Sequence, residues 1–257
     1  MDRKYTLITG GTKGIGLELA KLFAKDKNNL VIVSRILNEL EATKKALEKE
    51  FKISVEILKL DLSIDNSCEK LIEFVEEKNL VIENLVNNAG IGSFGYFDEV
   101  DTNKDIKLID INIVALTRLI KYFLPLMKER ESGGILNMAS TAAFVGGPKM
   151  STYYSSKAYV LTLSEALYEE SKEFNVNVSC VCPGPVKTSF QKNAGIKKSE
   201  KAKKYLMDAE DVAREAYNGF KNKKAIIVPG FNNKLMVIAT KFLPRSIIRK
   251  IIFSTNK

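Results

Sequence analysis

A glycine-rich turn that joins a short apolar strand to an amphipathic helix is the feature that most constrains the fold of this chain. Residues 6–9 form the predicted strand, residues 10–16 the turn, and apolar side chains recur at helical spacing over residues 17–24. Such a turn lets the backbone approach a pyrophosphate, whose charge then lies at the helix N-terminus. Its glycines follow the spacing G-x-x-x-G-x-G instead of the more common G-x-G-x-x-G. The sequence therefore predicts a dinucleotide-binding element near its start.

Strands and helices continue to alternate along the rest of the chain. Strands are predicted at residues 30–33, 53–60, 85–90 with a small-residue turn, 135–138, 175–182 and 225–228. Helices are predicted at residues 38–51, 65–78, 103–130, 153–173 and 208–220, with Asp65 and Asp208 as caps. This order predicts an α/β fold, a doubly wound parallel sheet with helices on both faces. A length of 257 residues, 45% of them apolar, suits one large domain, residues 1–230, followed by a tail, residues 231–257.

Arg35 follows the second predicted strand and bears on the choice of cofactor. It lies 19 positions after Gly16, near where an acidic residue would bind the ribose 2′-hydroxyl of NAD. A guanidinium suits a 2′-phosphate instead, because it is a planar cation with several donors. Lys13, within the glycine turn, could add a second positive charge. The sequence thus favours NADP over NAD; the alternative is that Arg35 is simply a solvated residue at a strand end.

Tyr153 and Lys157 form a candidate proton-transfer pair. They are four residues apart on a predicted helix and share one face, and Ser140 precedes Tyr153 by thirteen positions at a predicted strand end. A nearby ammonium lowers the pKa of a phenol, which is otherwise near 10. Alone, this spacing is also that of an ordinary helix start with polar side chains. Histidine is absent, which excludes histidine-based triads and general bases.

Asn112 stands in the interior of the long helix predicted at residues 103–130. Asparagine forms helices poorly, so a buried one needs a reason. It is either an accident of composition or a functional break in the helix.

Together these motifs resemble the short-chain dehydrogenase/reductase family, of the NADP-preferring type, over roughly residues 4–230. The resemblance rests on the glycine turn, on Asp61, on the run Asn87-Asn88-Ala89-Gly90, on the set Asn112, Ser140, Tyr153 and Lys157, and on Pro183-Gly184 with Thr188. It implies a Rossmann-like sheet of about seven strands in the order 3-2-1-4-5-6-7. It also implies a homodimer or homotetramer and a small-molecule carbonyl or alcohol substrate.

The resemblance also implies roles for individual residues. Tyr153 would be the general acid/base, Ser140 would hold the substrate oxygen, Lys157 would lower the tyrosine pKa and hold the nicotinamide ribose, and Asn112 would position a water. The implied cofactor contacts are Gly10, Thr12, Lys13, Gly14, Ile15, Gly16, Arg35, Asp61, Leu62, Asn88, Ala89, Gly90, Tyr153, Lys157, Pro183, Gly184, Val186 and Thr188.

The expected activity is an NADP(H)-dependent oxidoreductase that transfers hydride between a carbonyl and an alcohol. A 3-oxoacyl-thioester reductase is the alternative, and a non-catalytic NADP-binding regulator is a further one. The polar, lysine-rich stretch at about residues 186–207 is the expected substrate loop, and its pattern does not name the substrate.

Positive charge is concentrated at the end of the chain. The net charge is +9, and no acidic residue follows Glu215, whereas nine lysines and arginines do. Apolar residues at helical spacing predict two amphipathic helices around Pro244, with Leu235, Ile238, Ala239 and Phe242 on one face of the first and Ile247, Ile248, Ile251 and Ile252 together on the second. These helices would pack on the domain or a second subunit, or else contact a membrane surface or an acyl chain. No aromatic or fold signal supports nucleic-acid binding.

The cysteines and the N-terminus give an expectation about location and metals. Cys68, Cys180 and Cys182 are too few and too irregularly spaced for a disulfide framework, and zinc is not expected without histidine. The first residues show no apolar signal-peptide core, and no apolar run is long enough to span a membrane. A cytoplasmic location is expected.

Overall fold

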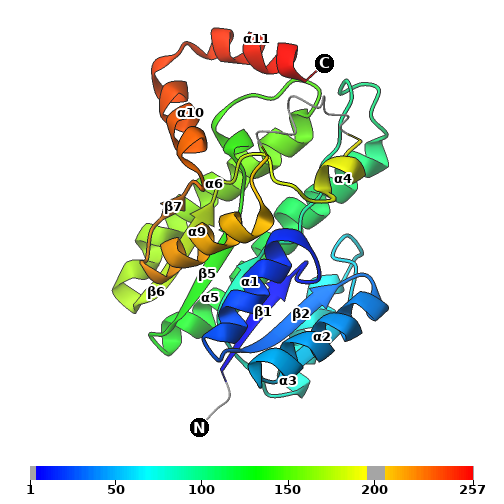
Figure 1. The fold of residues 1–257 in the computed structure, drawn as a ribbon, viewed down its shortest axis with the longest axis vertical. Helices are drawn as coiled ribbons and strands as arrows, with labels where there is room; N and C mark the ends of the chain where they lie inside the picture. Colours follow the sequence, from blue (N-terminus) through cyan, green and yellow to red (C-terminus); the bar gives the residue numbers. More distant parts are fainter. Residues whose placement is uncertain (1–3, 196–205, 257) are drawn as a thin grey trace.

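A seven-stranded parallel sheet forms the centre of the molecule in the computed structural model, which describes residues 4–195 and 206–256 (Figure 1). The strand order is β3-β2-β1-β4-β5-β6-β7, so the predicted order is confirmed. The strands are β1 Lys4–Thr9, β2 Asn29–Ser34, β3 Val55–Lys59, β4 Val81–Asn87, β5 Gly133–Met138, β6 Val176–Val181 and β7 Ile226–Ile227. The order reverses between β1 and β4, and this switch point is where α/β sheets of this kind bind ligands.

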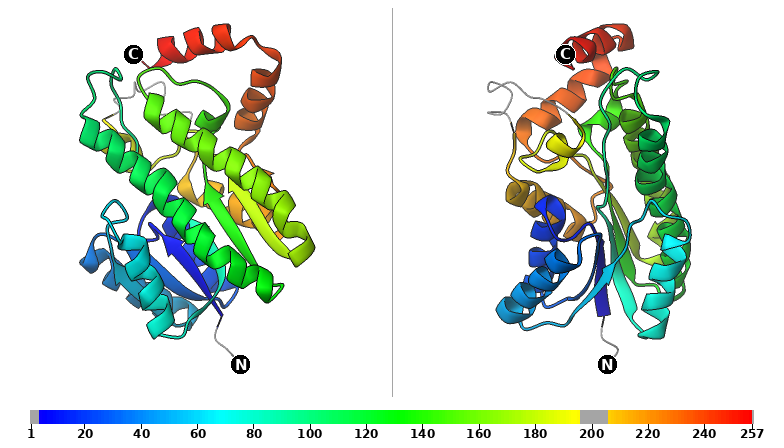
Figure 2. Two further views of the ribbon diagram at one scale, coloured as in Figure 1. Left: turned by 180° about the vertical axis from the view of Figure 1, so that it is seen from behind. Right: turned by 90° about the vertical axis from the view of Figure 1, so that its right-hand side faces the viewer.

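Helices cover both faces of the sheet. The main helices are α1 Gly14–Lys25, α2 Leu37–Phe51, α3 Ser67–Glu77, α4 Thr102–Ile109, α5 Leu116–Glu129, α6 Ser151–Ser171 and α9 Ala209–Lys221. Helices α1, α2 and α9 bury their apolar sides on one face, where Phe23 packs edge-on against Tyr217. Helices α3, α5 and α6 cover the other face, seen from behind in Figure 2.

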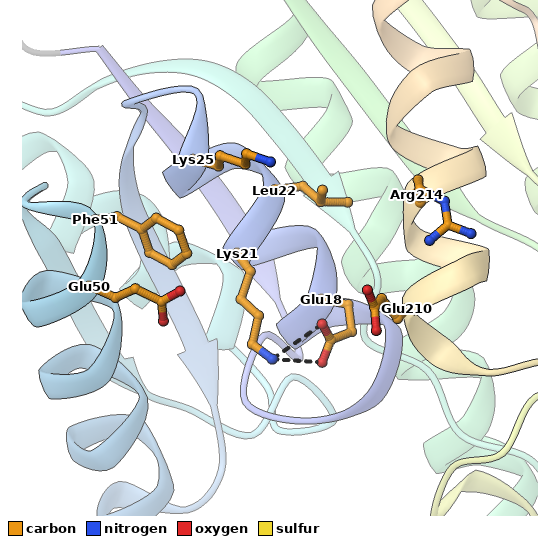
Figure 3. Close-up of a pocket in the computed structure, with 8 residues that line it drawn as sticks. All are labelled: Glu18, Lys21, Leu22, Lys25, Glu50, Phe51, Glu210 and Arg214. Atoms are coloured by element: carbon orange, nitrogen blue, oxygen red, sulfur yellow. Dashed lines mark hydrogen bonds and ion pairs between the residues drawn. The ribbon is translucent and has the colours of Figure 1, made fainter.

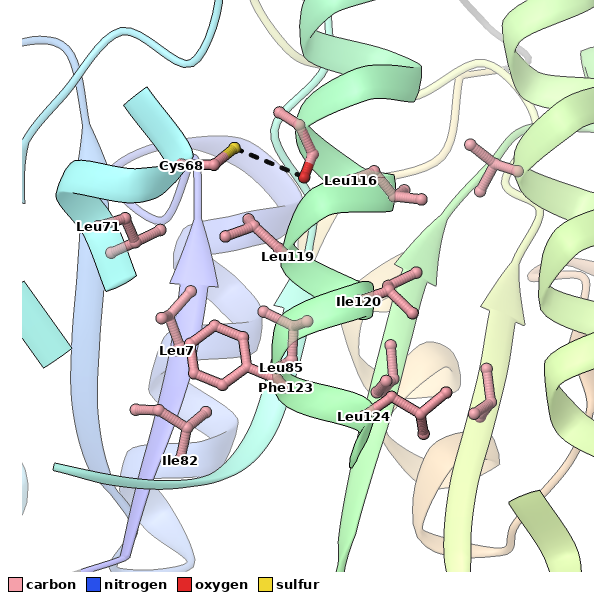
Figure 4. Close-up of a cluster of buried hydrophobic side chains, with 14 of the residues drawn as sticks. Leu7, Cys68, Leu71, Ile82, Leu85, Leu116, Leu119, Ile120, Phe123 and Leu124 are labelled. Carbon is pink, nitrogen blue, oxygen red and sulfur yellow. Dashed lines mark hydrogen bonds between the residues drawn. The ribbon is translucent and has the colours of Figure 1, made fainter. Parts of the chain in front are cut away.

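Apolar alternation along the strands explains this layering. On β1, Leu7 faces the layer of α3, α5 and α6, and the next residue, Ile8, faces the layer of α1 and α2. Both side chains are fully buried. Figure 4 shows the first layer, in which Leu119 and Phe123 of α5 lie against Leu7 and Leu85. The two cores hold the strand ends in fixed positions, and the candidate site is built on those ends.

Several predicted boundaries are wrong in detail. The last strand was expected at residues 225–228, but only Ile226–Ile227 pairs with β6. Asp65 does not cap α3: the helix begins after Asn66, which adopts a left-handed conformation, because a turn through Ile64 intervenes. Asp208 does stand at the N-cap of α9, without a side-chain hydrogen bond.

The tail forms two helices, α10 Phe231–Phe242 and α11 Arg245–Thr255, as the apolar spacing predicted. Pro244 stands immediately before α11, at its N-cap. Both helices lie at the end of the molecule opposite the N-terminus (Figures 1 and 2). Among the residues that the structure describes, no helix is both long and apolar enough to cross a membrane.

Candidate active site

The glycine turn between β1 and α1 is closed by contacts that exclude a side chain. A Cβ on Gly16 would lie 2.3 Å from the Gly10 carbonyl oxygen and 2.4 Å from Asn88 Nδ2. Gly10 and Gly14 have φ angles of 68° and 54°, which glycine adopts without strain. The first turn of α1 therefore packs directly against the glycine turn, and helix N-termini of this kind bind phosphate groups.

Asn88 and Thr9 fasten this turn to the end of β4. The Asn88 amide donates to the carbonyl oxygens of Thr9 and Gly10, each at 3.0 Å. The Thr9 hydroxyl accepts from the backbone amides of Asn88 and Ala89, at 3.1 and 3.0 Å. The run Asn88-Ala89-Gly90 thus holds the predicted cofactor turn in place across the switch point.

The two cations expected near the cofactor's 2′-position differ in their surroundings. Arg35 is exposed after β2, and no ion pair joins it to a carboxylate within residues 4–195 and 206–256. Lys13 instead pairs with Glu39, with 2.7 Å between Nζ and Oε1, and the Thr12 hydroxyl donates to the same carboxylate. The contribution of Lys13 as a second positive charge stays a prediction, and Glu39 competes for its ammonium in this structure. This pair could not be predicted from the sequence, because the two residues are 26 positions apart.

Arg35, Asp61 and Gly90 line one pocket at the ends of β1, β2, β3 and β4. Leu62 and Ala89 line it as well. Burial raises the pKa of Asp61, but hydrogen bonds from Ser63 and the nearby Lys107 ammonium outweigh it and hold this pKa below its usual value. The Asp61 carboxylate thus stays charged and oriented at neutral pH, where it could accept a hydrogen bond from a ligand.

The segment after β6 closes over the glycine turn from the other side. A Cβ on Gly14 would lie 3.0 Å from Thr188 Cγ2. The Pro183 carbonyl oxygen accepts from the Thr141 amide at 2.9 Å, and Val186 forms a bridge with Met207. The segment that contains Pro183, Gly184, Val186 and Thr188 thereby runs from Ser140 to the glycine turn, and its contact with a nicotinamide stays a prediction.

Helix α6 presents Tyr153 and Lys157 one turn apart, and both side chains are buried. The Lys157 ammonium donates to the Met138 carbonyl oxygen at the end of β5, at 2.8 Å, and lies 5.8 Å from the Tyr153 ring centroid. Ser140 follows β5; its hydroxyl accepts from the Ala142 amide at 3.1 Å and donates to the Pro183 carbonyl oxygen at 3.4 Å, and it lies close enough to Tyr153 to influence the pKa of the phenol. Three residues that are separated in the sequence therefore meet where β5 ends.

Gly90 brings the lysine and Asn112 together. A Cβ on Gly90 would lie 3.2 Å from Asn112 Oδ1 and 3.3 Å from Lys157 Nζ. Asn112 lies in a π-helical turn, Asp110–Ala115, between α4 and α5, so the predicted helix does break at this residue. Its side chain accepts from the Ile91 amide and donates to the Ile91 carbonyl oxygen and the Ser156 hydroxyl, each at 3.0 Å. The side chain is thus fully engaged with protein groups, and its direct effect is to fix the loop after β4 against α6.

Burial dominates the acid–base properties of the pair. It raises the pKa of Tyr153 to about 12, although the Ser140 hydrogen bond lowers it in part. It lowers the pKa of Lys157 to about 8, although Cys180 and Cys182 oppose this shift. The expectation that Lys157 lowers the tyrosine pKa is therefore wrong for this arrangement, because the ammonium is directed to Met138 and desolvation is the larger effect. A phenol with this pKa is protonated at neutral pH and suits proton donation.

Two further residues support the site and were not anticipated. Ser156 accepts from Asn112 and donates to the Tyr153 carbonyl oxygen at 2.7 Å. Asp105 accepts from both Ser93 and Thr152 at 2.7 Å, which joins the loop after β4 to the first turn of α6. Ser156 could have been predicted, because it is a polar residue next to Lys157 on the buried face of α6. Asp105 could not, because its sequence context is that of an ordinary exposed acidic residue on a helix.

Part of the expected substrate loop covers Tyr153. Helix α7, Phe190–Asn193, places Phe190 with its ring centroid 5.4 Å from that of Tyr153. Gly92 lies beneath the same ring, since its Cβ would be 2.9 Å from Phe190 Cζ. Residues 196–205 of this loop lie outside the described residues.

A second hollow, between α1, α2 and α9, is remote from these residues (Figure 3). Acidic and basic groups alternate around it, and Lys21 donates to Glu18 within it. Because the charges compensate each other, it offers no counterpart to the polar groups that converge beside Gly90.

A dinucleotide-binding α/β protein is the class that this sheet, the glycine turn and the pocket at the switch point define. The chain belongs to the short chain dehydrogenase family, whose model matches residues 4–199.

Individual relatives agree with this assignment. The chain is 34% identical over 189 residues to a very-long-chain 3-oxoacyl-CoA reductase-like protein of Arabidopsis thaliana, covering 72% of this chain and 60% of that protein. It is 33% identical to an NADP-dependent 3-hydroxy acid dehydrogenase of Schizosaccharomyces pombe, covering 74% of each chain. It superposes with a TM-score of 0.85 on a short-chain dehydrogenase from Sphingobium yanoikuyae in complex with NADPH, at 28% identity and 95% coverage of both. The chain spans about 60% of the length of the first curated relatives it matches.

Proposed function

We propose that this chain is an NADPH-dependent reductase that interconverts a carbonyl compound and its alcohol. The observation that carries the proposal is the meeting of the Tyr153 phenol, the Ser140 hydroxyl and the buried Lys157 ammonium at the end of β5, beside Gly90. A phenol, a hydroxyl and an ammonium are the groups that a carbonyl oxygen needs as it becomes an alkoxide. A bound nicotinamide cofactor would supply the hydride.

Each residue has a distinct proposed role. Tyr153 donates a proton to the developing alkoxide, and Ser140 donates a hydrogen bond to the same oxygen. Lys157 holds the nicotinamide ribose and restores the proton, and Asn112 fixes the backbone beside it. The pKa of Tyr153 is raised to about 12, so the phenol is protonated at neutral pH and can act as the acid in the reduction.

The residues of the pocket fit a dinucleotide. Glycines stand at the positions of the turn where a side chain would clash, and Asp61 and Leu62 line the pocket, where we propose that they contact the adenine. We propose the same set of cofactor contacts that the family resemblance implies. Lys13 is expected to contribute less to the binding of the 2′-phosphate than Arg35, because its ammonium pairs with Glu39. NADP is proposed over NAD because Arg35 is exposed at the pocket with no carboxylate paired to it among the described residues.

A 3-oxoacyl-thioester reductase is the second candidate. Two relatives, named as a very-long-chain 3-oxoacyl-CoA reductase-like protein and a 3-hydroxy acid dehydrogenase, support it. A purely regulatory NADP-binding role has less support, because Asn112, Ser140, Tyr153 and Lys157 are all present.

The proposal is tested by measuring NADPH oxidation against a panel of ketones, aldehydes and 3-oxoacyl thioesters. Turnover of a ketone or aldehyde supports the leading candidate, and turnover confined to thioesters supports the second. NADPH binding without turnover of any member of the panel would favour the regulatory role instead.

The remaining assignments are proposals of the same kind. We propose a dinucleotide-binding domain at residues 1–230 with a substrate loop near residues 186–207, a tail at residues 231–257, and a homodimer or homotetramer. A cytoplasmic location is supported by three buried cysteines that are not in disulfides.

A further inference from the structure

The tail carries an apolar surface that faces away from the domain. In α10, Phe231, Leu235, Ile238 and Phe242 follow the spacing i, i+4, i+7, i+11, which places them on one side of the helix. We call these four residues the apolar stripe. Phe231 is 78% exposed and Phe242 81%, whereas Val237, on another side of α10, is buried. The usual arrangement of an amphipathic helix is thus inverted, with its apolar side in solvent.

Helix α11 continues this surface. Ile248 is buried, and Ile247 and Ile251 are about half exposed. Nine of the eighteen exposed large apolar side chains among the described residues lie in residues 231–256. Scattered exposed apolar residues are ordinary, but a concentration of this kind marks a contact surface.

A second part of the chain extends the same surface. The Lys149 ammonium lies 4.9 Å from the Tyr96 ring centroid and 5.6 Å from that of Phe253 in α11. Phe97, next to Tyr96, is 70% exposed. The loop after β4 and the end of α11 therefore present aromatic side chains at one end of the molecule, with a lysine between them.

The charge within the tail has one sign, whereas the loop after β4 carries Asp98 and Glu99 beside Phe97. Lys241, Arg245, Arg249 and Lys250 belong to the tail, and the sequence has no acidic residue after Glu215. Lys234 is paired with Glu215, at 3.3 Å. A two-fold contact between two copies of the tail would bring like charges together without acidic partners in the tail, which is unfavourable. Anionic phospholipid headgroups are complementary to both the cations and the apolar side chains.

We propose that α10 and α11 dock the protein on an anionic membrane surface. The apolar stripe, with Ile247 and Ile251, enters the boundary between headgroups and acyl chains, and the basic residues contact the headgroups. The tail also contacts the loop before the site: Asn256 donates to the Pro148 carbonyl oxygen at 2.9 Å, five residues before Tyr153. Docking would bring this end of the candidate active site toward the lipid. The proposal does not depend on the reductase activity.

The test is co-sedimentation of the full chain with vesicles, without substrate or cofactor. We expect binding to vesicles of equimolar phosphatidylserine and phosphatidylcholine, and much weaker binding to phosphatidylcholine alone. Leu235→Ser with Phe242→Ser should weaken binding by about tenfold or more, because two apolar side chains no longer enter the membrane. Lys241→Gln, Arg245→Gln and Lys250→Gln together should weaken it about 100-fold.

Ile106→Ser with Leu126→Ser is the matched control, since both residues are exposed and lie on α4 and α5, away from the tail. This variant should bind vesicles as the unmodified chain does, and unfolding midpoints of all variants should agree within a few degrees. Binding that is absent from both vesicle types would overturn the proposal. So would equal binding by the stripe variant and the control. If the chain sediments as a dimer that only the stripe variant dissociates, and vesicles capture none, the surface is a subunit interface and the proposal fails.

Discussion

At the scale of single residues, Lys157 is a buried cation whose burial costs folding free energy. Burial lowers its pKa from 10.5 to about 8, and its hydrogen bond to Met138 offsets only part of the lost hydration. A shift of this size corresponds to roughly 3 kcal/mol between the two protonation states. A group retained at such a position is expected to act in the site rather than to stabilise the fold.

The unfolding free energy should therefore depend on pH through this residue. Between about pH 8 and 10.5 the unfolded chain binds more protons at Lys157 than the folded chain does, so the stability of the unmodified protein rises with pH in this window. Lys157→Met removes that dependence. In urea denaturation, we expect the stability of Lys157→Met relative to the unmodified protein to be greatest near pH 7 and to decline by about pH 10. An identical difference at both pH values would contradict the burial argument.

Arg35 gives a second prediction at this scale. Arg35→Ser should weaken NADPH binding by about 10–100-fold, because hydrogen bonds to a phosphate are lost, and should leave NADH binding nearly unchanged. Lys13→Gln is the comparison, and a smaller loss is expected because Glu39 already pairs with that ammonium. Isothermal titration with both cofactors measures these effects. Tighter binding of NADH than of NADPH by the unmodified chain would overturn the proposed role of Arg35.

At the scale of elements, the π-helical turn between α4 and α5 is the least regular part of the fold and the one most closely tied to the site. It places Asn112 so that one side chain holds both the Ile91 backbone and Ser156 of α6. The loop after β4 and the helix that carries Tyr153 are thereby fixed relative to each other. Irregular helical turns of this kind are often found at functional sites.

Asn112→Ala should affect stability and cofactor binding together. Loss of three buried hydrogen bonds is expected to lower the unfolding free energy by about 2–4 kcal/mol and to weaken NADPH binding, because Gly90 is no longer held. Asn103→Ala, an exposed position on α4, should change both quantities little. A variant at Asn112 that unfolds normally and binds NADPH normally would show that this clamp is not needed.

Much of the element-level description could be predicted from the sequence. The alternation of strands and helices, the glycine turn and the spacing of Tyr153 and Lys157 are local patterns along the chain, whereas the strand order was implied by the family resemblance. The structure has that sheet and brings those side chains together. The pairing of Lys13 with Glu39 and the orientation of Lys157 toward Met138 could not be predicted, because each depends on a partner that only the folded chain brings near. The apolar side of α10 was predicted from the helical spacing of its residues. Its exposure to solvent could not be predicted, because it depends on how the helix packs on the domain.

At the scale of the whole molecule, the tail is coupled to the segment proposed to bind the nicotinamide. A Cβ on Gly184 would lie 2.3 Å from Asn233 Oδ1, and Asn233 donates to the Pro229 carbonyl oxygen at 2.7 Å. The start of α10 is therefore seated directly on the segment that follows β6. A substitution in one of these two parts should therefore affect the packing of the other.

Gly184→Ala tests this coupling. The added methyl group must displace Asn233, and overpacking of this kind typically lowers the unfolding free energy by about 1–3 kcal/mol. Combining it with Asn233→Ala should recover part of the loss, and the double-mutant cycle from urea denaturation measures the coupling. Strictly additive effects of the two substitutions would mean that the tail is not seated on Gly184.

The measurement that tests the central claim most directly compares two neighbouring tyrosines. Kinetics of NADPH-dependent reduction should be measured for the unmodified chain, Tyr153→Phe and Tyr154→Phe on one substrate that is turned over. If Tyr153 is the proton donor, Tyr153→Phe lowers kcat by about 10²–10⁴-fold with NADPH binding retained, and Tyr154→Phe stays near the unmodified rate. Equal rates for Tyr153→Phe and the unmodified chain would contradict the account.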